Sequence, residues 1–305
     1  MKRVGLLVLG SFINSLGTGL SAFGLAVVML RAYGTASSVS AVQMSAFAPI
    51  VLLAPLAGVL ADRYDRRLMM IIGDAGSVLG LGIILAALSS PRPSLAWVCT
   101  GAILSSCLAA LTEPALRASV TDLVTEEDYV RASGLLQLAS AAKYLLAPAA
   151  AGFLMPVVGV RGLVLLDAST CLVTVVCTMT VRRALAADAP QRAATQPGDD
   201  HGFLAGWRAI TSSPGLRLLV ILMTLATLAI GVIQVLIKPI LLPTVSTSEM
   251  GVIETVAAIG MLVGATLVTA WKSAQPTTLL TAGLAATGIA MILVPLGPGA
   301  WWVAA

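Results

Sequence analysis

Gly58-Val59-Leu60-Ala61-Asp62-Arg63-Tyr64-Asp65-Arg66-Arg67 is the stretch that decides the fold of this 305-residue chain. It holds three arginines and two aspartates between two long apolar runs. Such a cluster cannot lie in hydrocarbon, where each unpaired charge costs about 2.5–3.5 kcal/mol. We therefore expect a short connection between two membrane helices, placed at a water-facing surface.

Composition places the chain in the membrane class. Hydrophobic residues make up 58%, charged residues 10%, and the mean hydropathy is +0.98. A helix needs about 20 apolar residues to cross a bilayer, and alternating barrel-type strands are absent from the sequence. The sequence therefore predicts an all-α polytopic membrane helical bundle of about nine transmembrane helices. The expected spans are Val4–Leu30, Val39–Ala61, Leu68–Leu88, Leu95–Leu111, Ala132–Val158, Gly162–Val181, Leu216–Leu242, Met250–Trp271 and Thr277–Leu296.

The positive charges indicate the orientation of these spans. If the N-terminus is cytoplasmic, thirteen lysines and arginines fall in cytoplasmic segments and four outside, and Lys143 is left within the membrane. This asymmetry satisfies the positive-inside rule. We expect a multi-pass protein of the plasma (inner) membrane, and the net charge of +4 then requires no nucleic acid partner.

The pattern Gly58-x-x-x-Asp62-Arg63-x-x-Arg66-Arg67 resembles the loop signature between helices 2 and 3 of the major facilitator superfamily (MFS). The resemblance implies a cytoplasmic gate in which the glycine permits close packing and the charges, Asp65 included, form a latch. It also implies that Asp62 pairs with an arginine of helix 4, here Arg117, and with the end of helix 11. The alternative is that this cluster only anchors the topology.

Glu113 stands four residues before Arg117, on the same helical face. A pair at this spacing can interact directly, which would allow a small charge relay. Helix 11 has no counterpart among the nine expected spans, so the latch of the family would lack one of its receivers.

The longest polar stretch follows the sixth expected span and indicates two halves. We assign residues 1–183 to a six-helix N-terminal half, 184–215 to a cytoplasmic linker and 216–305 to an incomplete C-terminal half of three helices. Within the linker, Phe203, Trp207 and Ile210 have the spacing of an amphipathic surface helix, although a disordered connector is the alternative. Members of the resembled family carry twelve helices. The sequence therefore looks truncated after the ninth, unless another chain supplies the missing helices.

A second resemblance lies in the fifth expected span, where antiporters of the superfamily carry a glycine-rich stretch ending in Gly-Pro-x-x-Gly-Gly. Gly134, Pro148 and Gly152 occupy matching places, whereas Lys143 is a departure from that pattern. Together with the segments 113–119 and 124–134, this stretch resembles bacterial drug:proton antiporters of the macrolide-efflux and enterobactin-exporter type. The resemblance implies export.

Three charged residues fall within the first six expected spans and are candidates for coupling or substrate binding. Lys143 lies about 18 Å along its helix, near the bilayer midplane, and either contacts substrate or is bonded to a neighbouring helix or Tyr144. Asp167 either exchanges protons or pairs with Lys143 or Arg161. For Asp74 we favour a structural counter-charge to the Arg63–Arg67 cluster over a proton site.

Taken together, these features predict an MFS secondary transporter that exports a small amphiphilic solute or drug, driven by protons. Alternatives are a flippase for lysophospholipids and a truncated, non-transporting remnant or partner subunit. No nucleophile–base constellation, phosphate loop or dinucleotide fingerprint occurs in the sequence, so an enzyme is not expected. Nor do we expect a cofactor or metal, because no cysteine pair has metal-ligand spacing with histidine.

Overall fold

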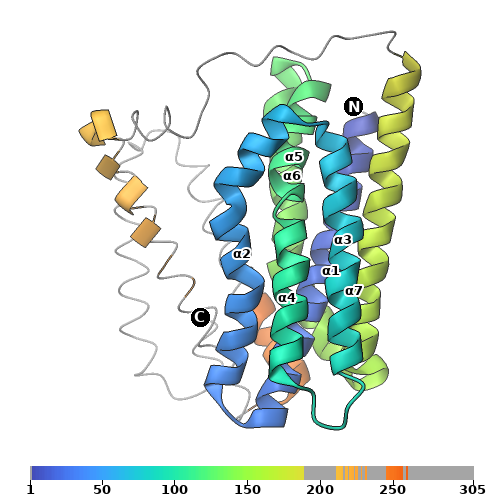
Figure 1. The fold of residues 1–305 in the computed structure, drawn as a ribbon, viewed down its shortest axis with the longest axis vertical. Helices are drawn as coiled ribbons and strands as arrows, with labels where there is room; N and C mark the ends of the chain where they lie inside the picture. Colours follow the sequence, from blue (N-terminus) through green and yellow to red (C-terminus); the bar gives the residue numbers. More distant parts are fainter. Residues whose placement is uncertain are drawn as a thin grey trace.

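The computed structural model describes residues 2–188, part of the segment 211–231, residues 245–256 and residue 259. In these residues the regular elements are α-helices, which form a bundle with roughly aligned axes (Figure 1). The helices of the first half are α1 (Lys2–Tyr33), α2 (Ala36–Arg63), α3 (Arg66–Ala87), α4 (Leu95–Ala109), α5 (Thr112–Leu123), α6 (Glu126–Leu145) and α7 (Ala147–Asp188). Within the described part, five helical stretches are long and apolar enough to cross a membrane.

The fourth expected span is longer than the sequence predicts. Helices α4 and α5 form one apolar stretch over Leu95–Leu123, whereas the expected span ends at Leu111. Hydropathy falls where Glu113 and Arg117 appear, so an apolar scan stops there. After a turn at residues 110–111 the backbone nevertheless resumes as helix α5, because Glu113 and Arg117 are good helix formers.

The fifth and sixth expected spans are divided differently from the prediction. Helix α6 ends at Leu145, and α7 contains the end of the fifth span and all of the sixth, with non-helical backbone at Gly159 (φ 67°, ψ 176°). A positive φ is strained for residues with a Cβ, so glycine suits this reversal. Pro148 lies in the first turn of α7, where its missing N–H is tolerated. The run Ala132–Val158 is therefore two helices rather than one.

Two pairs of contacts fix how α3 and α7 lie side by side. Asp65, which precedes α3, bonds to Arg182 near the end of α7, while the Leu88 carbonyl, just after α3, accepts from Arg161 at the start of the sixth span. The two helices are therefore antiparallel. We call the end with Asp65 and Arg182 the charged end and the opposite end, with Leu88, Pro91 and Pro93, the proline end.

Helix α1 packs along the same stretch of α7 through glycines seven residues apart. A Cβ at Gly10 would contact Cys177 at 3.4 Å, one at Gly17 would overlap Thr170, and one at Gly24 would lie 2.8 Å from Leu163. Glycine lets helix backbones approach closely. Gly76 and Gly80 allow a similar close approach between α3 and α4.

A helical segment, residues 247–256, packs on α1 and α7 at the proline end (Figure 1). Its fully buried Met250 and Ile253 share a core with Phe23 of α1 and Ala151 of α7. The linker segment with Phe203, Trp207 and Ile210, and the last expected span, lie outside the described residues. The division into halves and the truncation remain predictions.

Candidate functional site

At the charged end, Asp65 organises the connection between α2 and α3. Its Oδ1 accepts from the backbone N–H groups of Arg67 (3.0 Å) and Leu68 (3.3 Å), which caps α3, and its Oδ2 accepts from Arg182 Nε at 3.0 Å. Burial alone raises the pKa of this carboxyl. The hydrogen bonds and the Arg182 charge outweigh that effect and hold the pKa of Asp65 below its ordinary value.

Arg66 joins three helices at the same end. Its guanidinium donates to the carbonyls of Ala61 (3.3 Å) and Ala118 (3.0 Å) and to Asp122 Oδ1 (2.6 Å). Neither Asp122 nor Arg182 is among the residues that the sequence singles out. Their positions at the ends of α5 and of the sixth span were the available signal, because charges at span ends are placed to meet one another at the water-facing surface.

The pairing that the resemblance implies for Asp62 differs from the contacts that the structure shows. Arg117 pairs with Glu113 at 2.7 Å, one helical turn away, so the predicted Asp62–Arg117 pair is wrong for this conformation, while the Glu113–Arg117 contact is confirmed. Asp62 and Arg63 are exposed, and a Cβ at Gly58 would meet nothing within 4 Å. Close packing at Gly58 is therefore not found among the described residues.

Asp167 is buried in the interior of the bundle, with 3% of its surface exposed. It accepts hydrogen bonds from two hydroxyls of α1, Ser21 Oγ and, at 3.4 Å, Thr18 Oγ1. Lys143 acts on it electrostatically, although no ion pair between them occurs among the described residues. The expected pairing with Arg161 is wrong, since Arg161 donates to the Leu88 carbonyl at 2.6 and 2.9 Å.

Lys143 is half-buried near the end of α6. Its Nζ lies 5.7 Å from the centre of the Tyr144 ring, and its backbone packs against Gly19 of α1. The contact with Tyr144 is the one that the structural alternative predicted. The alternative in which Lys143 contacts substrate stays a prediction.

Asp74 does not meet the arginine cluster. The side chain is 2% exposed, and its Oδ1 accepts from Thr112 Oγ1 of α5 at 3.1 Å. Within the Arg63–Arg67 cluster, Arg66 binds Asp122 and Arg63 is exposed. No hydrogen bond or ion pair joins Arg67 to Asp74 among the described residues. The prediction of Asp74 as the counter-charge of this cluster is therefore wrong for the described residues, because Asp74 turns toward α5.

Two of the three antiporter-type residues lie at the contact between the halves. A Cβ added at Gly152 would lie 3.0 Å from the Thr247 carbonyl oxygen. The carbonyl of Gly152 accepts a hydrogen bond from Ser248 Oγ at 3.0 Å. Pro148 is buried, and its carbonyl oxygen would be overlapped by a Cβ at Gly251. Gly134 is exposed in open space, so only the later part of the predicted stretch brings backbones together.

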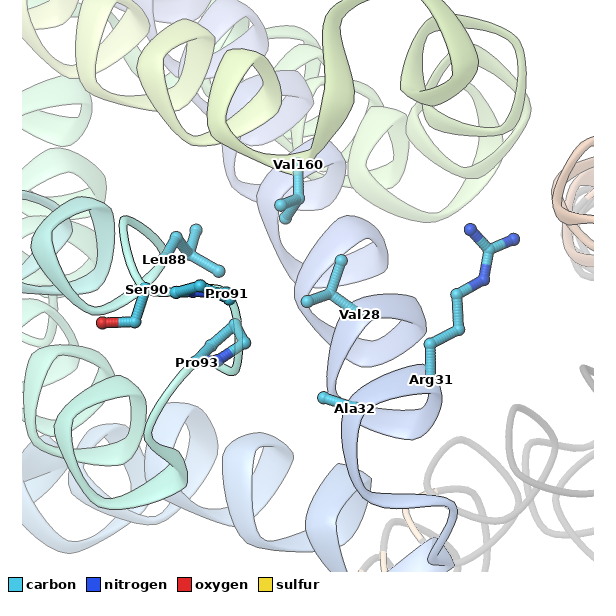
Figure 2. A pocket seen from close by; sticks show the side chains of 8 residues that line it. All are labelled: Val28, Arg31, Ala32, Leu88, Ser90, Pro91, Pro93 and Val160. Carbon is cyan, nitrogen blue, oxygen red and sulfur yellow. The ribbon is translucent and has the colours of Figure 1, made fainter.

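A cleft of about 350 Å³ opens at the proline end and contains none of the predicted site residues. Figure 2 shows Val28 and Ala32 of α1 facing Leu88, Pro91 and Pro93, whereas the side chain of Arg31 points away from them. Arg31 instead donates to Thr247 Oγ1 at 2.6 Å. Arg31, which also lines the cleft, thus links α1 to Thr247 at this end of the bundle.

Comparison with known proteins identifies the family. The sequence profile of the Major Facilitator Superfamily matches residues 7–305. The chain belongs to this superfamily. Its MFS helices form a membrane bundle, as predicted, and a POT family transporter, PepTSo, has a similar fold (TM-score 0.55, 16% identity, 96% of this chain and 58% of that one).

Curated MFS relatives include two proteins named macrolide efflux protein A. The one from Streptococcus pyogenes is 26% identical over 269 residues, which cover 87% of this chain and 66% of the relative. The one from Enterococcus faecalis is 25% identical over 264 residues, covering 85% of this chain and 81% of the relative. The chain therefore spans just under two thirds of the length of the first relative.

Proposed function

We propose that this MFS chain exports a small amphiphilic solute of macrolide type across the plasma membrane in exchange for protons that move inward. The two curated relatives, both named macrolide efflux protein A, support this class of substrate. The observation that carries proton exchange is Asp167, a carboxylate buried between α1 and α7 whose partners are hydroxyls rather than a cation. Ionisable residues inside the membrane commonly serve proton relays.

The protonation state of Asp167 affects how α1 and α7 are held together. As a carboxylate it accepts from Ser21 and Thr18 and attracts the Lys143 ammonium. Binding a proton removes the charge, so the attraction to Lys143 and the strong, charge-assisted hydrogen bonds from α1 weaken. Protonation therefore alters the contact between α1, α6 and the sixth span, where a bound amphiphile would compete with the proton.

The charged end is the side we place in the cytoplasm, in keeping with the positive-inside rule. The described contacts between the halves lie at the opposite, proline end, through Arg31–Thr247 and Gly152–Ser248. In alternating access these contacts would separate while the charged end closes. Arg66 and Asp65 would keep the first half rigid through that movement, because they bind helices within it.

Transport by the purified chain in proteoliposomes tests this proposal. An inwardly directed proton gradient should drive erythromycin out of the vesicles against its concentration gradient. A protonophore should abolish this transport. Lysophosphatidylcholine in the same vesicles provides the comparison. Preferential movement of the lysolipid would indicate a lysophospholipid flippase instead of a drug exporter. Failure to move either compound under any gradient would contradict transport activity.

A further inference from the structure

Asp74 is a second buried carboxylate of the first half, and the contacts described so far give it no role. Its Oδ1 accepts from Thr112, while its Oδ2 is buried without a hydrogen-bond partner among the described residues. Leaving a buried polar oxygen unpaired costs roughly 1–3 kcal/mol. A carboxylate kept at such a cost, without an ion pair in the described part of the chain, needs a reason other than stability.

The register of α3 against the sixth span places Asp74 beside polar residues of α7. Asp65 meets Arg182 and Leu88 meets Arg161, so position 74 of α3 lies opposite positions 173–175. Cys171 is one turn to one side of this level and Thr178 one turn to the other. The charges of Asp74 and Asp167 both lie close enough to act on the Cys171 thiol, which agrees with this register.

Depths along the bundle follow from the helical rise of about 1.5 Å per residue. Measured from the Asp65–Arg182 pair, Asp74 lies about 14 Å into the bundle, Cys171 about 16 Å and Asp167 about 22 Å. Asp74 is thus between the charged end and Asp167, and Cys171, whose Sγ lies 3.3 Å from Asn14 Oδ1, is between the two carboxylates.

Other unpaired polar atoms lie on the shallower side of Asp74. Thr178 Oγ1, at about 6 Å depth, and Arg67 Nε, at about 3 Å, are both buried without a hydrogen-bond partner in the described part of the chain. Arg67 is two helical turns before Asp74, on the same face of α3. Buried polar atoms of this kind are the usual hydrogen-bonding sites of internal water.

We propose that Asp74 is a second proton-binding residue, which passes protons between Asp167 and the charged end of the bundle. This inference rests on the proposed proton exchange. A proton leaves the carboxylic acid of Asp167, crosses on water beside Cys171 and Asn14, and forms an O–H bond on Asp74. A second transfer, to water near Thr178 and Arg67, restores the Asp74 carboxylate and releases the proton at the charged end.

The other charged and titratable groups around α3 have separate roles. On α5, Glu113 pairs with Arg117 and Asp122 with Arg66; at the end of α7, Arg182 pairs with Asp65. Helix α4 contributes only Cys99 and Cys107. Cys171 and Asp167 are therefore the groups that share the surroundings of Asp74.

The test compares Asp74→Asn with Ser77→Ala in proteoliposomes that carry the intact chain. Ser77 is buried one turn further along α3 and bonds only to backbone carbonyls, so Ser77→Ala is the matched control. Erythromycin counterflow needs no net proton transfer and should persist in both variants. Gradient-driven erythromycin transport should fall at least about tenfold in Asp74→Asn alone, since a missing proton-transfer group typically costs that much or more.

Three results separate the inference from the proposed function. Gradient-driven transport by Asp74→Asn at the wild-type rate would overturn the inference and leave proton exchange intact. Absence of gradient-driven transport in the wild type would contradict proton exchange itself. The third result comes from a pH titration of the carboxylic-acid C=O band by infrared spectroscopy: Asp74→Asn should remove one titrating band, and an unchanged set of bands would overturn the inference. If Asp74→Asn does not fold, Asp74→Glu should retain both coupling and the band.

Discussion

Arg182 donates through Nε to Asp65 Oδ2 at 3.0 Å and so ties the last turns of α7 to the residue that caps α3. The family pattern directs attention to Asp62, three residues earlier. In this structure Asp62 is exposed, and Asp65 is the carboxylate that holds two helices together. Which of the two aspartates stabilises the charged end is therefore an experimental question.

Asp65→Ala should destabilise the protein by about 1 kcal/mol through the lost helix cap, whereas Asp62→Ala should leave stability nearly unchanged. The pKa of Asp65 is lowered in the fold, so its contribution is present above the ordinary value of 3.8 and is lost as the pH falls through the lower folded pKa. Thermal unfolding in detergent across acidic pH should show the gap between wild type and Asp65→Ala closing. An equal loss in Asp62→Ala would refute this assignment.

Gly17→Ala should destabilise the contact between α1 and the sixth span by about 1–3 kcal/mol, because the added methyl group overlaps Thr170 and approaches the Asp167 backbone. Gly10→Ala is the matched control on the same face, since its Cβ would lie at an ordinary 3.4 Å from Cys177. Thermal unfolding of both variants measures the difference. Similar unfolding temperatures for the two would show that close packing at Gly17 is unimportant.

Gly251→Ala should impair transport by forcing the halves apart at the proline end, because the new methyl group overlaps the Pro148 carbonyl of α7. Backbone cannot move aside as a flexible side chain can. Gly134→Ala serves as the control, since a Cβ there meets nothing within 4 Å. Erythromycin counterflow should slow in Gly251→Ala and persist in Gly134→Ala. The opposite ranking would show that the contact of Gly251 with Pro148 is unimportant for transport.

Asp167→Asn should keep substrate counterflow but lose the response to a proton gradient, because asparagine accepts from Ser21 and Thr18 without binding a proton. Ser21→Ala removes a donor and leaves the carboxylate, so it should change the pH dependence of transport rather than abolish coupling. Rates measured over a pH series check both variants. A wild-type gradient response in Asp167→Asn would remove Asp167 from the mechanism.

The helical bundle was predictable because long apolar runs separated by charge clusters admit few other structures. Hydropathy does not report backbone dihedral angles, so the reversal at Gly159 and the break after Leu145 escaped it. The glycines at positions 10, 17 and 24 were visible as a period of seven, but their partner helix was not. Likewise, the burial of Asp167 could be foreseen, while its hydroxyl partners come from a helix distant in sequence.

Direct measurement of proton release tests proton exchange through Asp167 most sharply. Purified protein in weakly buffered detergent solution, with a pH-sensitive dye, is mixed with erythromycin. The wild type should release protons as the drug binds, and Asp167→Asn should bind the drug, as followed by intrinsic tryptophan fluorescence, without releasing them. Proton release from Asp167→Asn equal to that of the wild type would contradict the account.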